Sequence, residues 1–255
     1  MISVGFDSFN ISVPETLEQL DIIERLAGTE RIMLKPNLVT PQPHPVTTSA
    51  DGCRAVIKYL RSKTDADIVI AEGTGDPSHS TLEVFEKLGY RKLADEFGVD
   101  LIDLNTEPLK KLARNDCPRF PEIYLPEIAF DYFIISLPVL KAHSLSDVTG
   151  SLKNMMGFAP PSHYSGTQGI WNKAKFHNNI HQAIIDLNKY RKADMTLLDA
   201  SIGLADYHLG GRTCDPPVNK LIAGFDPLAV DRKAAELLGL DWREIPHLAA
   251  SLVGH

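Results

Sequence analysis

The stretch FIISLPVLKAHSLSDVTGSLKNMMG, residues 133–157, decides the fold and places polar side chains directly after a strand. Its first eight residues are mostly apolar and rich in β-formers, which predicts a buried strand. The chain then changes to Lys141 and His143, and Lys153 and Asn154 follow among small residues. Because burying such groups near a core is costly, this composition favours a functional site. A polar loop with helix-capping residues is the ordinary alternative.

Composition describes a globular protein with an acidic balance. The 255 residues are 44% hydrophobic and 23% charged, enough to bury a large core. The net charge of -7 disfavours a non-specific binder of nucleic acid or of an anionic membrane surface. The N-terminal residues show neither a basic region nor a long apolar run, and no segment reaches the roughly 18 apolar residues of a spanning helix. We therefore expect no signal peptide, no membrane span and a cytoplasmic location.

The three cysteines argue against a cysteine-based framework. Cys53, Cys117 and Cys214 are far apart and odd in number, which disfavours both paired disulfides and a CxxC metal site and suits a reducing compartment. An iron–sulfur cluster normally takes four thiolates, so none is expected here. The alternative is that the fold brings the three isolated thiols together as ligands of a cluster.

Strands alternate with helices along the chain, which predicts an α/β fold. Strands are expected near residues 31–34, 67–71, 132–137 and 195–199. Because helices separate them, we expect a mostly parallel sheet with helices on both faces, in a single domain over residues 1–255. Residues 105–127 carry prolines, charges and the short run EIYL, and are predicted to form a small inserted excursion.

Polar residues follow several of these strands, and their positions predict a site. They are Lys35 with Asn37, Glu72, Lys141 with His143, Asp199 and Asp226. Ligands of parallel sheets bind beyond the carboxyl ends of the strands, so residues at several ends should meet there. Lysines gathered in an acidic protein favour a small anion, either a carboxylate or a phosphate. Neighbouring lysines also lower one another's pKa, which would make one of them a base near neutral pH.

Roles follow from this arrangement. We expect Lys141, His143 and Lys153 to act as acid, base and electrophilic groups. The ligand would be positioned by Lys35, Asn37, Thr47, Glu72, Asn154 and Asp199.

Histidines next to a long loop suggest a metal. The loop over residues 158–175 has the length of a lid or binding loop. A helix is predicted over residues 176–190, and His177 and His181 would lie four apart on its same side, with His163 as a third ligand. The zincin pattern needs a glutamate where Asn178 stands, so a metalloprotease is disfavoured. Capping or surface histidines, or rings that clamp an anion, are the alternatives.

Several motifs resemble one family across nearly the whole chain. They are KPN (35–37), EG (72–73), PVLKAH (138–143), SLKNMMG (151–157), LLDA (197–200) and AGFDPLAVDRKAAELLG (223–239). Together they resemble the family named domain of unknown function 362, many of whose members carry a ferredoxin-like module and an iron–sulfur label. This chain has no clustered cysteines, so that label is not carried over. The resemblance implies no particular reaction.

A fainter similarity concerns the nickel-pincer lactate racemase family. It rests on the order of the strand ends and on the helical histidines, and the histidine signature of that family does not align cleanly here. The sequence therefore predicts an enzyme for a small anionic substrate, with isomerase- or racemase-like or metal-assisted chemistry and an optional divalent zinc or nickel ion. The rival hypothesis is a non-catalytic accessory module for a cofactor or metallocentre, working with a separate ferredoxin-like partner. A closed pocket would favour the enzyme and a flat cationic patch the module. Whether the protein forms a homo-oligomer stays open.

Overall fold

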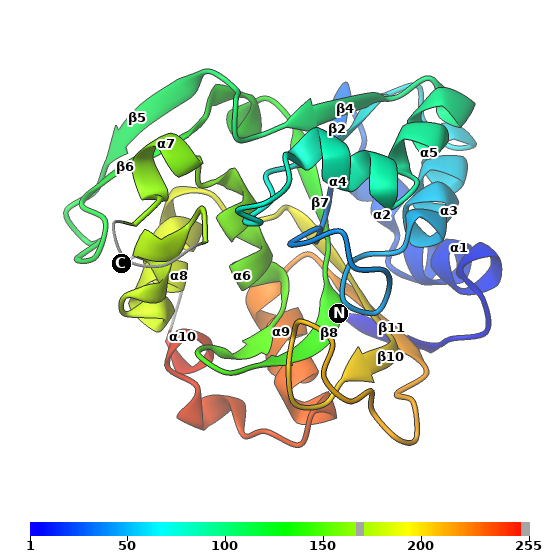
Figure 1. The fold of residues 1–255 in the computed structure, drawn as a ribbon. Helices are drawn as coiled ribbons and strands as arrows, with labels where there is room; N and C mark the ends of the chain where they lie inside the picture. Colours follow the sequence, from blue (N-terminus) through cyan, green and yellow to red (C-terminus); the bar gives the residue numbers. More distant parts are fainter. Residues whose placement is uncertain (167–170, 251–255) are drawn as a thin grey trace.

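The computed structural model describes residues 1–166 and 171–250 (Figure 1). Its strands are β1 (Ile2–Gly5), β2 (Arg31–Pro36), β3 (Asp67–Glu72), β4 (Asp100–Asp103), β5 (Leu109–Ala113), β6 (Glu122–Pro126), β7 (Phe133–Leu137), β8 (Val139–His143), β9 (Asp147–Thr149), β10 (Met195–Leu204) and β11 (Lys220–Gly224). Its α-helices are α1 (Phe9–Gln19), α2 (Ile22–Arg25), α3 (Ala50–Arg61), α4 (Thr81–Lys87), α5 (Tyr90–Phe97), α6 (Ser151–Asn154), α7 (Pro161–Tyr164), α8 (Ile180–Tyr190), α9 (Pro227–Leu237) and α10 (Pro246–Ala249). Short 3-10 turns are η1 (Glu127–Phe130), η2 (Met155–Phe158), η3 (Ala174–His177) and η4 (Trp242–Glu244).

One sheet runs through the molecule in the order β1-β11-β10-β7-β2-β3-β4. The four neighbouring pairs from β10 to β4 are parallel, and β11 is antiparallel to both β10 and β1. β8 continues from β7, pairs in parallel with the far part of β10 and is antiparallel to β9. The predicted mostly parallel α/β sheet is therefore confirmed.

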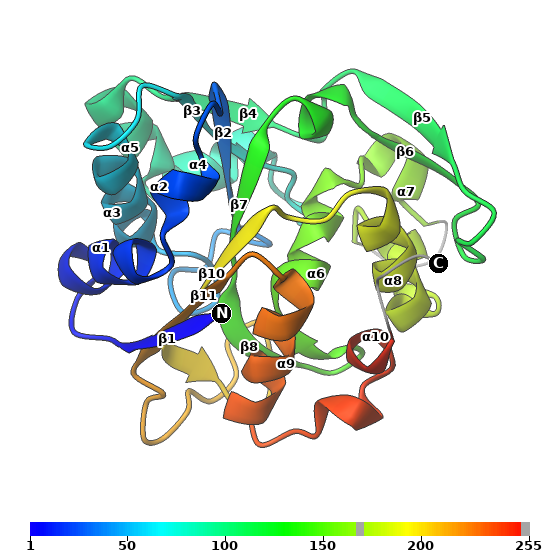
Figure 2. The same cartoon turned by 180° about the vertical axis from the view of Figure 1, so that it is seen from behind.

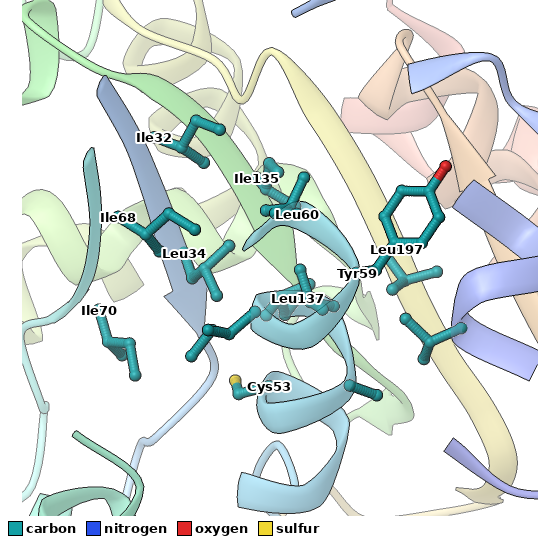
Figure 3. Packing of buried hydrophobic residues seen from close by; sticks show 14 of the residues in the cluster. Ile32, Leu34, Cys53, Tyr59, Leu60, Ile68, Ile70, Ile135, Leu137 and Leu197 are labelled. Carbon is teal, nitrogen blue, oxygen red and sulfur yellow. The ribbon is translucent and has the colours of Figure 1, made fainter. Parts of the chain in front are cut away.

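Alternating side chains attach helices to both faces of this sheet. Ile32 and Leu34 point into a core shared with α1, α3 and α5, whereas Met33 between them joins the core on the opposite face. Figure 3 shows part of the first core, where Leu60 of α3 lies over the strands. Helices α6, α8 and α9 cover the other face (Figure 2). A two-residue repeat on each central strand thus specifies both helix layers.

Residues 105–127 contain a separate two-stranded antiparallel sheet made of β5 and β6. Its buried side chains, Ile123 and Leu125 on β6, join the same core as α8 and η2. The hairpin lies at the outer edge of the molecule in Figure 1, beside α7.

Left-handed residues interrupt two helical segments. α1 and α2 are separate helices, because Asp21 between them adopts a left-handed conformation with φ of 54°. The helix expected from residue 176 begins only at Ile180, because Asn178 is extended and Asn179 is left-handed with φ of 56°. His177 consequently belongs to η3 and His181 to α8.

The loop predicted over residues 158–175 contains α7 and the start of η3, and its residues 167–170 lie outside the described part. Within residues 1–166 and 171–250, no helix combines the length and apolarity needed to cross a membrane.

Candidate functional site

A cavity of about 410 Å³ lies at the carboxyl end of the parallel strands. The segments that follow β2, β3 and β8 line it, together with α6, η2, the start of η3 and a loop after β10. The lining residues used below are Asn37, Glu72, Gly73, His143, Lys153, Asn154, Met156, Gly157, Trp171, Lys173, His177, Tyr207, His208 and Leu209. A pocket of this size is in the range of small-molecule sites.

A buried ion pair forms one wall. Lys35 Nζ lies 2.8 Å from Glu72 Oε1 and donates to the carbonyl oxygen of Pro36 and to Asn154 Oδ1. Burial lowers the pKa of Lys35, and the neighbouring Glu72 carboxylate opposes that shift. The second carboxylate oxygen of Glu72 accepts from the Leu38 N–H at 2.9 Å. These bonds hold Lys35 of β2 and Glu72 of β3 in place at the ends of the two neighbouring strands.

Gly157 permits this packing. A Cβ atom at this position would clash with both Glu72 Oε1 and Lys35 Cε. The glycine therefore lets η2 come close to the ion pair.

Lys141 is fully buried against the lining residue Asn37. Its Nζ donates to Asn37 Oδ1 at 2.6 Å and to the Val46 carbonyl oxygen at 2.7 Å. Burial, together with the charge of Lys153, lowers the pKa of Lys141 to about 7. Asn37 Nδ2 in turn donates to Asn154 Oδ1 at 3.1 Å, so one amide–lysine network connects β2, β8 and α6.

Lys173 lines the cavity from the segment just before η3. Its Nζ donates to the carbonyl oxygens of Met156 and Gly157 and to Asn105 Oδ1, at 3.1, 2.8 and 3.1 Å. Burial lowers the pKa of Lys173 to about 7, although Glu72 opposes the shift.

Lys153 differs from the other three lysines. It lines the cavity from α6, and its Nζ has neither a hydrogen-bond partner nor an ion-pair partner among the described residues. Burial alone lowers the pKa of Lys153 to about 8. The start of α6 is held by Asp231 of α9, whose carboxylate accepts from the N–H groups of Ser151 and Leu152 at 2.6 and 2.8 Å.

Two stacked histidines complete the wall. His143 Nδ1 accepts from the N–H groups of Leu145 and Ser146 at 3.1 and 3.3 Å, which leaves the ring proton of a neutral imidazole on Nε2. His143 stacks on His208 with 3.9 Å between ring centroids. Burial and the nearby Lys153 hold the pKa of His143 far below its usual value, and they lower that of His208 to about 3. Both rings are therefore neutral near pH 7.

Most of the residues predicted from the sequence lie together. Eight of them line the cavity or contact its lining: Lys35, Asn37, Glu72, Lys141, His143, Lys153, Asn154 and His177.

Two predicted ligand-binding residues do not lie at this cavity. Thr47 is buried and donates from Oγ1 to the Gln42 carbonyl oxygen. Asp199 accepts from His44 Nε2 at 2.9 Å and from the Ser201 N–H. The strand that carries Asp199 runs past the site to Leu204, which explains why its carboxylate lies away from the cavity.

The three histidines predicted to bind one metal ion, His163, His177 and His181, do not lie together, so this predicted metal triad is wrong. His163 stacks on Tyr124 of the hairpin at 4.0 Å, and His181 Nδ1 lies 2.9 Å from His247 Nδ1, so neither joins His177 at the cavity. The cause is the break at Asn178 and Asn179, which separates His177 from the helix of His181. Across residues 1–166 and 171–250, no three His, Cys, Asp or Glu side chains are grouped closely enough to hold a metal ion.

Sequence reasoning missed Lys173 and His208 as site residues. Lys173 precedes η3 in a loop with no periodic pattern, and His208 lies in the glycine- and proline-rich segment after β10. Neither follows a strand directly, so no sequence signal placed them here. The apolar lining by Trp171, Tyr207 and Leu209 comes from the same two segments.

Comparisons with solved structures show relatives of the fold. The lactate racemase apoprotein from Thermoanaerobacterium thermosaccharolyticum is similar with a TM-score of 0.58 and 16% identity, over 92% of this chain and 56% of that one. A protein from Thermotoga maritima is similar with a TM-score of 0.56 and 12% identity, over 94% of this chain and 60% of that one. This chain thus spans somewhat more than half the length of either protein. A search of curated proteins found no match.

The family comparison covers most of the chain. The family model described as domain of unknown function 362 matches residues 32–236, which run from the second residue of β2 to beyond β11 and include Lys35, Lys141, Lys153 and Lys173. The chain therefore belongs to the family of domain of unknown function 362.

Proposed function

We propose that this protein is an enzyme that binds a small carboxylate or phosphate in the cavity and acts on it by lysine- and histidine-based acid–base chemistry. The observation that carries the proposal is the charge balance of the walls. Lys153 and Lys173 line the cavity, Lys35 and Lys141 are hydrogen-bonded to its lining residues, and Glu72 is the one carboxylate in its described lining. In a partly desolvated site this excess of positive charge attracts an anion more strongly than it would in water.

The lowered pKa values support catalysis as well as binding. Lys141 and Lys153, at about 7 and 8, are divided between amine and ammonium near neutral pH, where proton transfer is most effective. Neutral His143 offers an N–H donor from Nε2 to a developing oxyanion. A concave cavity with a largely apolar lining also suits an enzyme better than the rival accessory module, for which a flat cationic surface was expected.

The fold neighbour adds support of a general kind. The similar lactate racemase apoprotein is named for lactate, which is a small carboxylate, and the same class of ligand is proposed here. An isomerase- or racemase-like reaction on such an acid is our leading hypothesis.

Tryptophan fluorescence tests the binding. Trp171 lines the cavity and Trp242 stacks on Arg232 elsewhere, so Trp171 should report an anion selectively. Benzoate, 3-phenylpropanoate and inorganic phosphate are titrated, with Trp171→Phe to assign the signal. We expect Lys153→Met to weaken binding of at least one anion by tenfold or more, whereas Lys92→Met on the exposed face of α5 should leave it unchanged. Equal responses of the two lysine variants, or no saturable response to any anion, would contradict the proposal.

A further inference from the structure

We propose that Lys153 is a nucleophile that forms an imine with a carbonyl compound carrying an anionic group. The inference rests on the proposed function, since it names the chemical class of ligand for the same cavity. It identifies that class as an oxo acid or a phosphorylated aldehyde or ketone.

Hydrogen bonding singles out Lys153 among the cavity lysines. The amine groups of Lys35, Lys141 and Lys173 each donate to two or three fixed oxygen atoms of the protein. An amine engaged in this way cannot turn its lone pair toward a ligand without breaking those bonds. Lys153 Nζ has no such partner among the described residues and lines the cavity, so its lone pair is available.

The surroundings also favour the neutral, nucleophilic form of this amine. Apolar side chains of Met156, Trp171 and Leu209 line the same cavity. Desolvation in such a pocket is a means by which lysine nucleophiles are activated. The lowered pKa of Lys153, about 8, is in agreement with this geometry.

Helix α6, which carries Lys153, is held in place by its neighbours. Asp231 is buried and binds both N–H groups that open α6, and Ser151 Oγ is hydrogen-bonded to Thr196 Oγ1 at 2.7 Å. Helix α6 is therefore anchored to α9 and β10, two residues before Lys153 in the sequence. The remaining lysines would hold the anionic group of the ligand while its carbonyl carbon faces Lys153.

The step balances without an added reagent. The lone pair of Lys153 Nζ forms the C–N bond as the carbonyl π electrons move to oxygen. The nitrogen gives up two protons in all, and these leave with the former carbonyl oxygen as one water molecule, so that a C=N bond remains. Nothing is oxidised or reduced.

Reductive trapping tests the inference. The full chain is incubated with glyoxylate, pyruvate or phenylpyruvate and with cyanoborohydride, and the product is analysed by intact and peptide mass spectrometry. We expect one equivalent of reduced adduct on Lys153 for at least one of the three acids. Lys153→Arg, which keeps the charge, should abolish that adduct, and Lys92→Arg should not. Peptide mapping of the wild type gives the answer even if the Lys153 variant folds poorly.

Matched acids without the oxo group separate the two proposals. 3-Phenylpropanoate and propanoate are titrated by Trp171 fluorescence in parallel. If they bind but no oxo acid labels Lys153, the imine is disproved and the anion site stands. Labelling spread over surface lysines, and unchanged in Lys153→Arg, would also overturn the imine. If no acid binds and no adduct forms, both proposals fail.

Discussion

Four buried lysine side chains, two in the cavity lining and two bonded to it, are the unusual feature at the level of single residues. A buried ammonium group without full compensation destabilises the fold, so such groups lower their pKa instead. Lys35 forms a direct ion pair with Glu72, whereas the amine groups of Lys141 and Lys173 donate only to neutral oxygens and feel Glu72 from a greater distance. Lys153 Nζ has no partner among the described residues. The ligand-free site is therefore under electrostatic strain that a bound anion would relieve.

This strain predicts how stability depends on pH. The pKa values of Lys141, Lys153 and Lys173 are about 7, 8 and 7 in the folded state, below the usual 10.5. At pH values between those folded-state pKa values and 10.5, the unfolded chain binds more protons than the folded one. The free energy of unfolding should therefore rise as pH increases from 7. Above pH 9 the Cys53 thiol, whose pKa burial raises to about 12, acts in the opposite direction.

Urea unfolding of the ligand-free protein between pH 7 and 9 measures this effect. We expect stability to increase over that window, and the increase to be smaller in Lys141→Met. A free energy of unfolding that falls steadily from pH 7 to 9 would be incompatible with the buried, uncompensated lysines.

The Lys35–Glu72 pair predicts a large mutational effect. Both side chains are almost fully buried, so Glu72→Gln would leave a buried ammonium without its carboxylate partner. Breaking a buried pair in this way typically costs about 3–5 kcal/mol. The exposed pair Lys111–Glu122 supplies the control, because Glu122→Gln should change stability by less than about 1 kcal/mol. Similar small losses for both variants, measured by urea denaturation, would show that Glu72 does not stabilise Lys35.

At the level of elements, α6 depends on its contact with α9. Asp231 accepts two backbone N–H groups with its two carboxylate oxygens, and an amide can accept with only one of its two terminal atoms. We therefore expect Asp231→Asn to destabilise the protein by about 1–3 kcal/mol and to weaken anion binding, because Lys153 shifts with α6.

Asp226→Asn is the matched control for that experiment. Asp226 caps α9 through one bond to the Leu228 N–H, and asparagine is an equally good capping residue. Thermal unfolding and the Trp171 titration are compared for both variants. An anion affinity that is unchanged in Asp231→Asn would show that anion binding does not depend on the position of α6.

Elements also show how far the sequence alone can be interpreted. Strands with a two-residue repeat and polar residues directly after them, such as Lys35 and Lys141, were predictable because parallel strands bring their ends together. The metal triad failed because one left-handed residue, Asn179, ends a pattern that looked like continuous helix. Lys173 and His208 depend on how two irregular segments fold over the sheet, which no local periodicity encodes.

For the molecule as a whole, the sheet order determines the site. β2 lies between β3 and β7, and β8 extends β7 beyond the edge where β2 and β3 end. Residues of these strands and of the segments that follow them therefore meet in one place, as do Lys35 and Asn154, which are 119 positions apart in the sequence. The α3 side of the sheet is a continuous apolar core, part of which is drawn in Figure 3. The polar groups of the site lie instead at the carboxyl edge.

Calorimetric titration with 3-phenylpropanoate between pH 7 and 9, in two buffers of different ionisation enthalpy, tests the anion site most directly. The carboxylate stays ionised throughout this range, so any proton exchange belongs to the protein. An anion stabilises the ammonium forms of Lys141, Lys153 and Lys173, whose pKa values start near 7 to 8. We predict net proton uptake on binding at pH 7.5 to 8 and an affinity that falls at least tenfold from pH 7 to 9. Binding without proton uptake, and with an affinity independent of pH, would contradict the lysine-lined anion site.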